Sequence, residues 1–192
     1  MTGGLAVQIQ ELIDCLESDP VVAAIADDKW EAAITSPSRV LFYLSAQLLT
    51  IGQRVQQAHD AGKIIFVHID LAEGIGKDRV GIRYLAQIGV DGILSTRAQM
   101  IRIAKDLDLL TVQRFFALDS KGMENIEEML RNTNPHLMEI MPGVIGKAIS
   151  RFSHGHVPVI AGGLIQTKAE VTEALRSGAA AVSTGQKELW YS

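Results

Sequence analysis

Short apolar runs and amphipathic stretches alternate along most of the chain. The first 19 residues carry apolar side chains at the spacing of one helical face, at Leu5, Ile9, Leu12, Ile13 and Leu16. Asp19-Pro20 then interrupts this pattern, because proline cannot continue the interior of a helix. We therefore predict an N-terminal helix within residues 1–19 that packs on the body of the protein or closes one end of it.

Beyond residue 20, eight short apolar runs have the length and bounds of buried strands. They cover residues 21–26, 40–44, 64–70, 92–96, 110–115, 137–141, 159–162 and 180–184. Amphipathic stretches between the runs predict helices, among them 97–107, 123–132, 147–153 and 168–177. Glycines typical of helix ends precede new runs at Gly62, Gly89 and Gly178.

This alternation predicts a (β/α)₈ TIM barrel over residues 20–192 that forms a single domain, 1–192, with the N-terminal helix. The 172 residues after position 20 leave about 21 per unit, in a fold that typically needs roughly 250. At least one helix must therefore be very short, and 27–36 is the weakest helical stretch. A doubly wound open sheet is the alternative. It is disfavoured because no G-x-G-x-x-G follows the first run and polar residues gather at many run ends.

Two runs near the C-terminus end in small residues suited to holding a phosphate. The first reads PVIAGG at 158–163 and the second AAVSTG at 180–185. The loops after the seventh and eighth strands of a barrel often form a phosphate site. Glycines there let backbone N–H groups approach the anion closely. These ends predict a small phosphate ester as the ligand.

Polar side chains stand at the end of the third run. His68 and Asp70 share one face of it. Ile65, Val67 and Ile69 share the other, and a barrel covered by helices needs that apolar face outward. We expect Asp70 to hold a ligand rather than to cap the following turn. For His68, a core histidine and a functional group remain equal alternatives.

The fifth and sixth runs bring opposite charges into the barrel. Strand parity allows only one of Gln113 and Arg114 to point inward, and it points Glu139 inward. A buried lone carboxylate is costly unless it is paired or bound to a ligand. We expect Glu139 to accept hydrogen bonds from ligand hydroxyls, and an ion pair with Arg114 is the structural alternative. Arg97, after the fourth run, is either an anion clamp or a solvated residue.

Composition narrows the class of protein. The chain is 47% apolar and 21% charged with a net charge of −4, which counts against nucleic-acid binding unless the contact is a local patch. It has no apolar run long enough for a membrane helix and no signal-like start, so we expect it in the cytoplasm. Cys15, the single cysteine, is expected to be a packing residue. No ligand spacing for a metal and no nucleophile motif is present, so we expect neither a metal nor a catalytic residue.

Six segments, in order, are similar to one known family. They are FVHIDL from Phe66, DGILST from Asp91, TVQRFFALDS from Thr111, MEIMPG from Met138, PVIAGGLIQT from Pro158 and AVSTGQKELW from Ala181. The chain resembles the glycerol-3-phosphate-responsive antiterminators, which regulate glycerol-uptake operons. The resemblance is close over residues 63–190 and looser before them.

The resemblance implies a (β/α)₈ barrel that binds the effector sn-glycerol 3-phosphate, without a cofactor. The liganded protein would act on the leader mRNA of glycerol-utilisation genes and prevent premature transcription termination. By strand position, the phosphate would then be cradled by Gly162, Gly163, Thr184 and Gly185. The glycerol hydroxyls would be read, or charge balanced, by His68, Asp70, Arg114 and Glu139. The basic residues nominated for RNA contact are Arg97, Arg102 and Lys105.

An enzyme is the alternative, because barrels with such a phosphate site host many activities. It would be an isomerase, lyase or transferase acting on a small phosphorylated sugar or triose. Asp70 or Glu139 would then be the general base and His68 the acid. A third reading is a metabolite-binding barrel that works through a protein partner.

Overall fold

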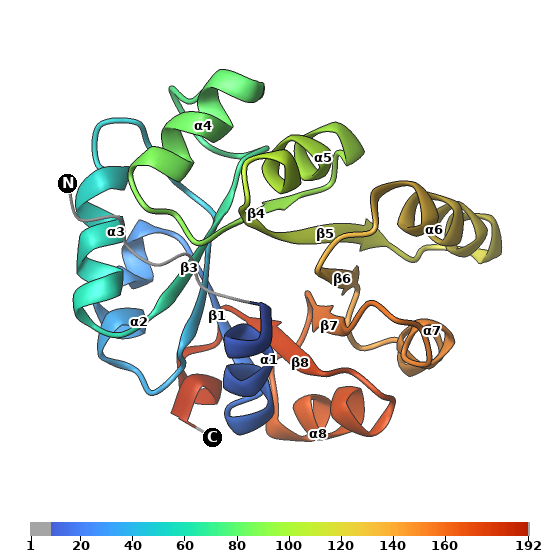
Figure 1. The fold of residues 1–192 in the computed structure, drawn as a ribbon. Coiled ribbons are helices and arrows are strands. Elements are labelled where there is room, and N and C mark those ends of the chain that lie inside the picture. Colours follow the sequence, from blue (N-terminus) through green and yellow to red (C-terminus); the bar gives the residue numbers. More distant parts are fainter. Residues whose placement is uncertain (1–8, 192) are drawn as a thin grey trace.

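The computed structural model describes residues 9–191, which form a closed barrel of eight parallel strands surrounded by helices (Figure 1). The strands are β1 Val21–Ile25, β2 Val40–Tyr43, β3 Ile64–His68, β4 Gly92–Ser95, β5 Leu110–Phe116, β6 Leu137–Met141, β7 Val159–Gly162 and β8 Ala181–Thr184. Each strand pairs with the next, and β8 closes the barrel on β1, with Val22 opposite Ser183. The predicted TIM barrel is confirmed, and the open doubly wound sheet is wrong.

The helices follow the strands in sequence order. They are α1 Ile9–Ser18, α2 Trp30–Thr35, α3 Ile51–Asp60, α4 Arg79–Gln87, α5 Ala98–Asp106, α6 Ser120–Thr133, α7 Gly146–Phe152 and α8 Lys168–Arg176, with 3₁₀ turns η1 Asp27–Lys29 and η2 Lys187–Tyr191. The helical segment after β1 is short: it consists of η1 and the six-residue α2, in the stretch predicted to be the weakest helix. The segment after β8 is short as well, because η2 is the helical element of that unit.

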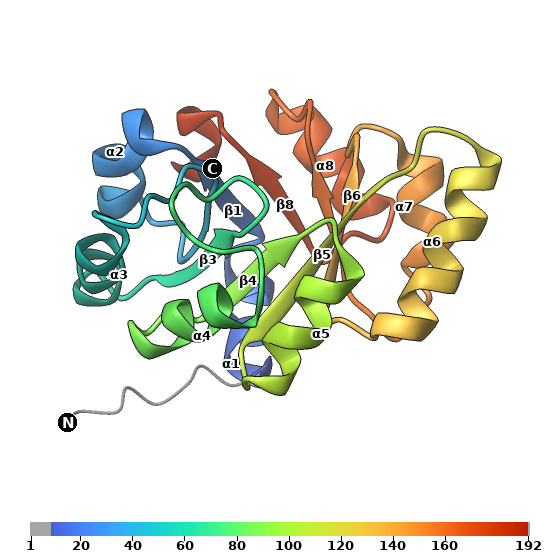
Figure 2. The same ribbon diagram turned by 90° about the horizontal axis from the view of Figure 1, so that it is seen from above.

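Helix α1 closes the amino end of the barrel. Leu12, Cys15 and Leu16 are buried in one cluster with the inward side chains of the strands, including Phe42 and Phe66. In Figure 2, α1 lies below the strands, on the side away from the loop between β3 and α4. The predicted N-terminal helix is confirmed from Ile9 to Ser18, whereas residues 1–8 lie outside the described part of the chain.

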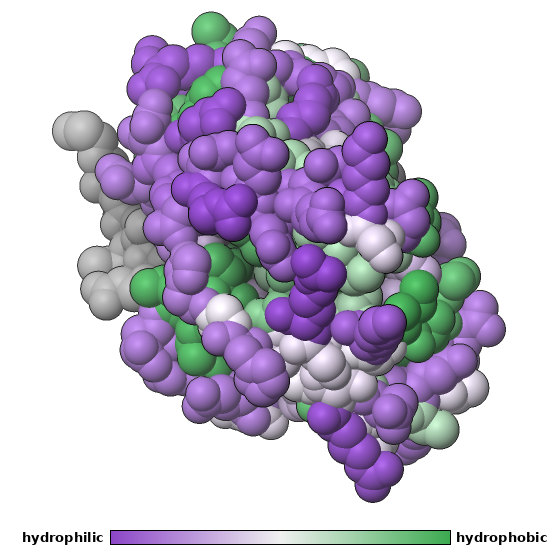
Figure 3. Space-filling model, turned by 90° about the vertical axis from the view of Figure 1, so that its right-hand side faces the viewer, coloured by the Kyte–Doolittle hydropathy of each residue, from purple (hydrophilic) through white to green (hydrophobic). Residues whose placement is uncertain are grey.

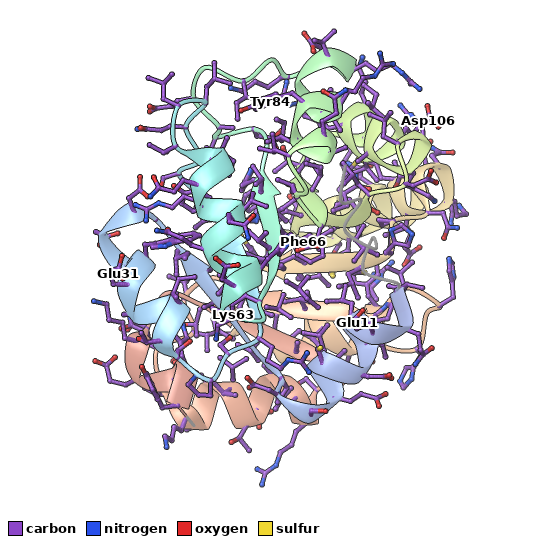
Figure 4. All side chains as sticks on the ribbon, turned by 60° about the vertical axis from the view of Figure 1, so that its left-hand side comes forward. Glu11, Glu31, Lys63, Phe66, Tyr84 and Asp106 are labelled. Atoms are coloured by element: carbon purple, nitrogen blue, oxygen red, sulfur yellow. The ribbon has the colours of Figure 1, made fainter. Side chains whose placement is uncertain are left out.

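Alternation along each strand produces two apolar layers. Inward side chains fill the barrel, and outward ones, such as Leu41 and Ile65, pack under the helices. Figure 4 shows Phe66 inside the ring of helices, while Glu31 and Asp106 lie at its outer surface. This is the arrangement that period-two apolar patterning in a helix-covered barrel requires.

The face of the molecule formed by α6 and α7 is mainly hydrophilic. Figure 3 shows the side of α6 and α7, where hydrophilic residues predominate and apolar ones gather in small groups. The helices on this side therefore turn a largely polar face outward. Within residues 9–191, no helix combines the length and apolar character needed to span a bilayer.

Several predicted bounds shift by a few residues. Strand β3 ends at His68, so Asp70 lies in the loop that follows rather than in the strand. Helix α6 begins three residues earlier than expected, because the Asp119 carboxylate caps it by accepting a hydrogen bond from the Gly122 N–H at 2.7 Å. Gly62, Gly89 and Gly178 all have positive φ, as expected where glycine ends a helix.

Candidate functional site at the carboxyl end of the barrel

A cavity of about 280 Å³ opens at the carboxyl ends of the strands. Its walls come from β1, β5, β6 and β8 and from the segments after β2, β7 and β8. Gly163, Thr184 and Gly185, three of the four residues predicted to cradle a phosphate, line it. The structure therefore brings the two glycine-bearing ends together around one cavity.

A buried charge pair lines the same cavity. The Glu139 side chain has no exposed surface, and its Oε2 accepts a hydrogen bond from Arg114 Nε at 2.5 Å. Its Oε1 accepts one from Ser183 Oγ at 2.5 Å. Arg114 is thus the inward residue of its pair, while Gln113 faces outward and accepts a hydrogen bond from Thr133 Oγ1 of α6. The ion pair that the sequence offered as the structural alternative is present, and both oxygens of the carboxylate are occupied.

Gly162 makes room for this pair rather than lining the cavity. A Cβ atom at Gly162 would stand 2.4 Å from Glu139 Oε1 and 2.7 Å from Ser183 Oγ. Such contacts are far below ordinary van der Waals distance. The glycine at this position therefore lets the carboxylate and the hydroxyl meet beneath the cavity.

The backbone at Gly163 and Gly185 is the part of the cavity suited to an anion. Gly163 has a φ of +74°, which favours glycine. Within residues 9–191, the N–H groups of Gly163 and Gly185 donate no hydrogen bond. The Thr184 hydroxyl, in contrast, donates to Ile165 O at 2.7 Å and accepts from the Gln186 N–H at 3.1 Å. Thr184 thus ties the two loops together, whereas the two glycine N–H groups have no acceptor among the described residues.

Asp70 belongs to a second polar cluster, at the ends of β3 and β4. Its carboxylate accepts hydrogen bonds from Ser95 Oγ at 2.7 Å, from the Thr96 N–H at 2.7 Å and from Thr96 Oγ1 at 2.9 Å. It also pairs with Arg97 Nε at 3.0 Å. Burial raises the pKa of Asp70, but these hydrogen bonds outweigh it and hold the pKa below its ordinary value. The carboxylate therefore anchors the turn between β4 and α5, a role that the sequence did not indicate.

His68 is buried, on the inward face of β3. Burial, assisted by the positive charge of Arg114, lowers its pKa to about 4, so the ring is neutral at pH 7. Among the described residues, His68 Nδ1 is a buried ring nitrogen without a hydrogen-bond partner. His68 is therefore a core histidine by position, with one nitrogen left unsatisfied.

The three cations nominated for RNA contact lie along α5. Arg97 precedes the first residue of the helix and Lys105 lies in its last turn, which separates them by about 12 Å along the axis. Arg97 pairs with Asp70, and Lys105 Nζ donates to the Thr133 and Asn134 carbonyls. Arg102 is exposed. The structure places these cations on one helix but not in one cluster.

Sequence reasoning missed two residues, one that lines the cavity and one beside it. Ser183 lines the cavity and was noted only as part of the AAVSTG segment. Lys29, in η1, lies far from it in sequence, yet its Nζ donates to Gly185 O at 2.6 Å. No local signal marks Lys29, because the contact depends on the pairing of β1 with β8. Within residues 9–191, no group of three His, Cys, Asp or Glu side chains is placed to hold a metal ion.

The structure is thus a (β/α)₈ barrel with a cavity at the carboxyl ends of its strands. A sequence model of the glycerol-3-phosphate responsive antiterminators matches residues 21–190. The chain belongs to that family, as its motifs predicted.

Two solved structures support this assignment. The glycerol uptake operon antiterminator regulatory protein from Listeria monocytogenes str. 4b F2365 is 32% identical, with a TM-score of 0.84 over 90% of this chain and 95% of that one. A glycerol uptake operon antiterminator-related protein from Thermotoga maritima MSB8 is 30% identical, with a TM-score of 0.80 over 88% and 96%. The uncharacterized protein YgcP of Escherichia coli K12 is 32% identical over 182 residues, 93% of this chain and 95% of that protein.

Proposed function

We propose that this protein is a glycerol 3-phosphate sensor that, when liganded, binds leader mRNA of glycerol-utilisation genes and prevents transcription termination. The observation that best supports a phosphate ligand concerns the N–H groups of Gly163 and Gly185. They donate no hydrogen bond within residues 9–191, and both glycines line one cavity. Family membership supports the effector and the regulatory role.

The size and lining of the cavity suit a ligand of this kind. Its volume of about 280 Å³ lies just below the range of roughly 300–1,000 Å³ for pockets that hold drug-sized molecules. The glycine N–H groups would receive the phosphate. Arg114, the hydrogen-bonded partner of Glu139, lines the same cavity and would donate to a glycerol hydroxyl with its remaining N–H groups.

Ligand binding would change the affinity for RNA through the loops at the carboxyl ends of the strands. The ligand would order the loops after β7 and β8, and the ordered state would be the one that binds RNA. With a net charge of −4, the contact must be a local basic surface. Arg102, with an exposed side chain on α5, is the first residue to test for it.

The contacts of the candidate acids and bases favour binding over catalysis. Glu139 has both oxygens hydrogen-bonded, and Asp70 accepts four hydrogen bonds. A general base needs a lone pair directed at the substrate. Recovery of chemically changed glycerol 3-phosphate after long incubation with stoichiometric protein would favour the enzyme instead.

Calorimetry with sn-glycerol 3-phosphate tests the sensor, with glycerol and inorganic phosphate as control ligands. We expect the ester to bind most tightly. Gly163→Asp places a negative charge in the cradle and abolishes binding. Gly62→Asp is the matched control, because Gly62 also has a positive φ, of 69°, but lies at the end of α3, away from the cavity. Equal loss of binding in both variants would contradict the cradle.

The regulatory half is tested by titrating leader RNA with and without glycerol 3-phosphate. Linkage requires the ligand to tighten RNA binding by the same factor by which RNA tightens ligand binding. A single RNA affinity in both conditions would refute the switch while leaving the ligand site intact.

A further inference from the structure

Lys29 places an ammonium group beside the glycine cradle. It is the last residue of η1, in the connection between β1 and α2, and its Nζ donates to Gly185 O at 2.6 Å. The position of a Cβ on Gly185 would be 3.4 Å from the same Nζ. Because β8 closes the barrel on β1, a residue near the start of the chain meets the end of the last strand.

Among the described residues, Lys29 has no carboxylate partner. Arg114, which lines the cavity, pairs with Glu139, and Arg97, in the second polar cluster, pairs with Asp70. Within residues 9–191, no carboxylate lies within 4.0 Å of Lys29 Nζ.

Asp27, two residues before Lys29, has other partners. The Asp27 carboxylate pairs with Arg54 at 3.1 Å and accepts a hydrogen bond from the Tyr43 hydroxyl at 2.7 Å. Lys29 therefore places a partly buried cation beside Gly185, which lines the cavity.

We infer that Lys29 supplies the positive charge for the ligand phosphate and so makes the cavity prefer a phosphate ester to the uncharged polyol. An ammonium group has three donors. One is used by Gly185 O, and two remain for phosphate oxygens. A phosphate dianion taken partly out of water needs such a partner, and glycine N–H groups alone carry only partial charge. This inference rests on the proposed function and names the residue that gives it charge selectivity.

The test is calorimetry at pH 7.5 with sn-glycerol 3-phosphate and with inorganic phosphate. Lys29→Gln and Lys29→Met both remove the charge, and we expect each to weaken binding of the ester by roughly 10-fold to 100-fold. Lys29→Arg keeps the charge and most of the affinity. Lys187→Gln is the matched control, because Lys187 is an exposed lysine two residues after Gly185. It changes the net charge equally, and we expect less than a roughly twofold change.

A pH series separates a charge partner from a structural residue. The second pKa of a phosphate monoester is about 6, so the wild-type affinity rises from pH 5 to pH 7.5 as the dianion forms. In Lys29→Gln this rise is smaller, a change that a mere loss of packing would not cause. Melting temperatures of all variants show that the compared proteins are folded.

The outcomes are distinguishable. A wild-type protein that binds the ester, with Lys29→Gln and Lys29→Met binding it equally well, overturns the role of Lys29 and leaves the sensor intact. A loss of affinity in Lys187→Gln as large as in Lys29→Gln also overturns it, because the effect is then one of net charge. A wild-type protein that binds neither the ester nor inorganic phosphate overturns the proposed function and this inference together.

Discussion

Gly162→Ala tests whether Gly162 serves the buried pair or the ligand. The added methyl would stand 2.4 Å from Glu139 Oε1 and 2.7 Å from Ser183 Oγ. Glu139 cannot swing away freely, because it has no exposed surface and Arg114 holds its other oxygen at 2.5 Å. The methyl must therefore lengthen at least one of the two hydrogen bonds to the carboxylate.

The size of the effect follows from known overpacking costs. An extra methyl in a well-packed interior costs about 1–3 kcal/mol, although alanine recovers part of this because glycine weakens a strand. For a chain of this length, 1 kcal/mol moves the melting temperature by about 2–4 °C. We expect Gly162→Ala to melt about 2–12 °C below the wild type.

Gly52→Ala is the matched control. Gly52 lies in α3, and no atom stands within 4 Å of the position that its Cβ would take. Alanine in a helix is favoured over glycine by about 0.5–1 kcal/mol, so this variant melts higher than the wild type. Both are measured by thermal unfolding and by urea titration. A Gly162→Ala protein that is as stable as the wild type but no longer binds ligand would refute the packing role and restore Gly162 to the cradle.

Two further predictions concern buried charge. Glu139→Gln leaves Arg114, whose side chain is 11% exposed, without a counter-ion, which lowers the free energy of unfolding in urea by up to about 3 kcal/mol. Glu127→Gln, at the exposed ion pair with Arg151, costs less than about 1 kcal/mol, and equal costs would contradict the burial argument. His68 has a pKa of about 4 when folded and about 6.5 when unfolded. The unfolded state thus binds the proton first as pH falls, and the stability that neutral His68 preserves above pH 6.5 is lost towards pH 4, by up to about 3 kcal/mol. The pH profile of His68→Gln should lack this loss, and an unchanged profile would be the contrary result.

The fold was predictable because the strands and helices can be recognised from local sequence patterns. Apolar runs that alternate with amphipathic stretches, with Gly62 or Gly89 at a helix end, need no long-range information. The parity of β6 likewise placed Glu139 inside the barrel. Parity also shows that only one of Gln113 and Arg114 faces the barrel interior, but it does not show which. A glutamine can be buried inside the barrel or, equally well, outside it under a helix. Only the hydrogen bond from Thr133 of α6 to Gln113 separates the two.

The site was less predictable because it depends on strand register. The sequence placed Asp70 at a strand end but could not show that Ser95, Thr96 and Arg97 would occupy its carboxylate. It placed Gly162 beside Gly163 but could not show that one lies against Glu139 while the other lines the cavity. These distinctions arise from the side chain on the neighbouring strand, which a single sequence does not reveal.

The closure of β8 on β1 also determines how long a chain under synthesis remains without a complete cavity. Lys29 and Gly185 touch across 156 positions of sequence. At a synthesis rate of about 5–20 residues per second, roughly 8–30 s pass between the synthesis of Lys29 and that of Gly185. A nascent chain has no complete cavity during that interval, however much phosphate ester surrounds it. If the cavity is the effector site proposed above, a newly made chain would respond to the metabolite only after β8 has closed the barrel on β1.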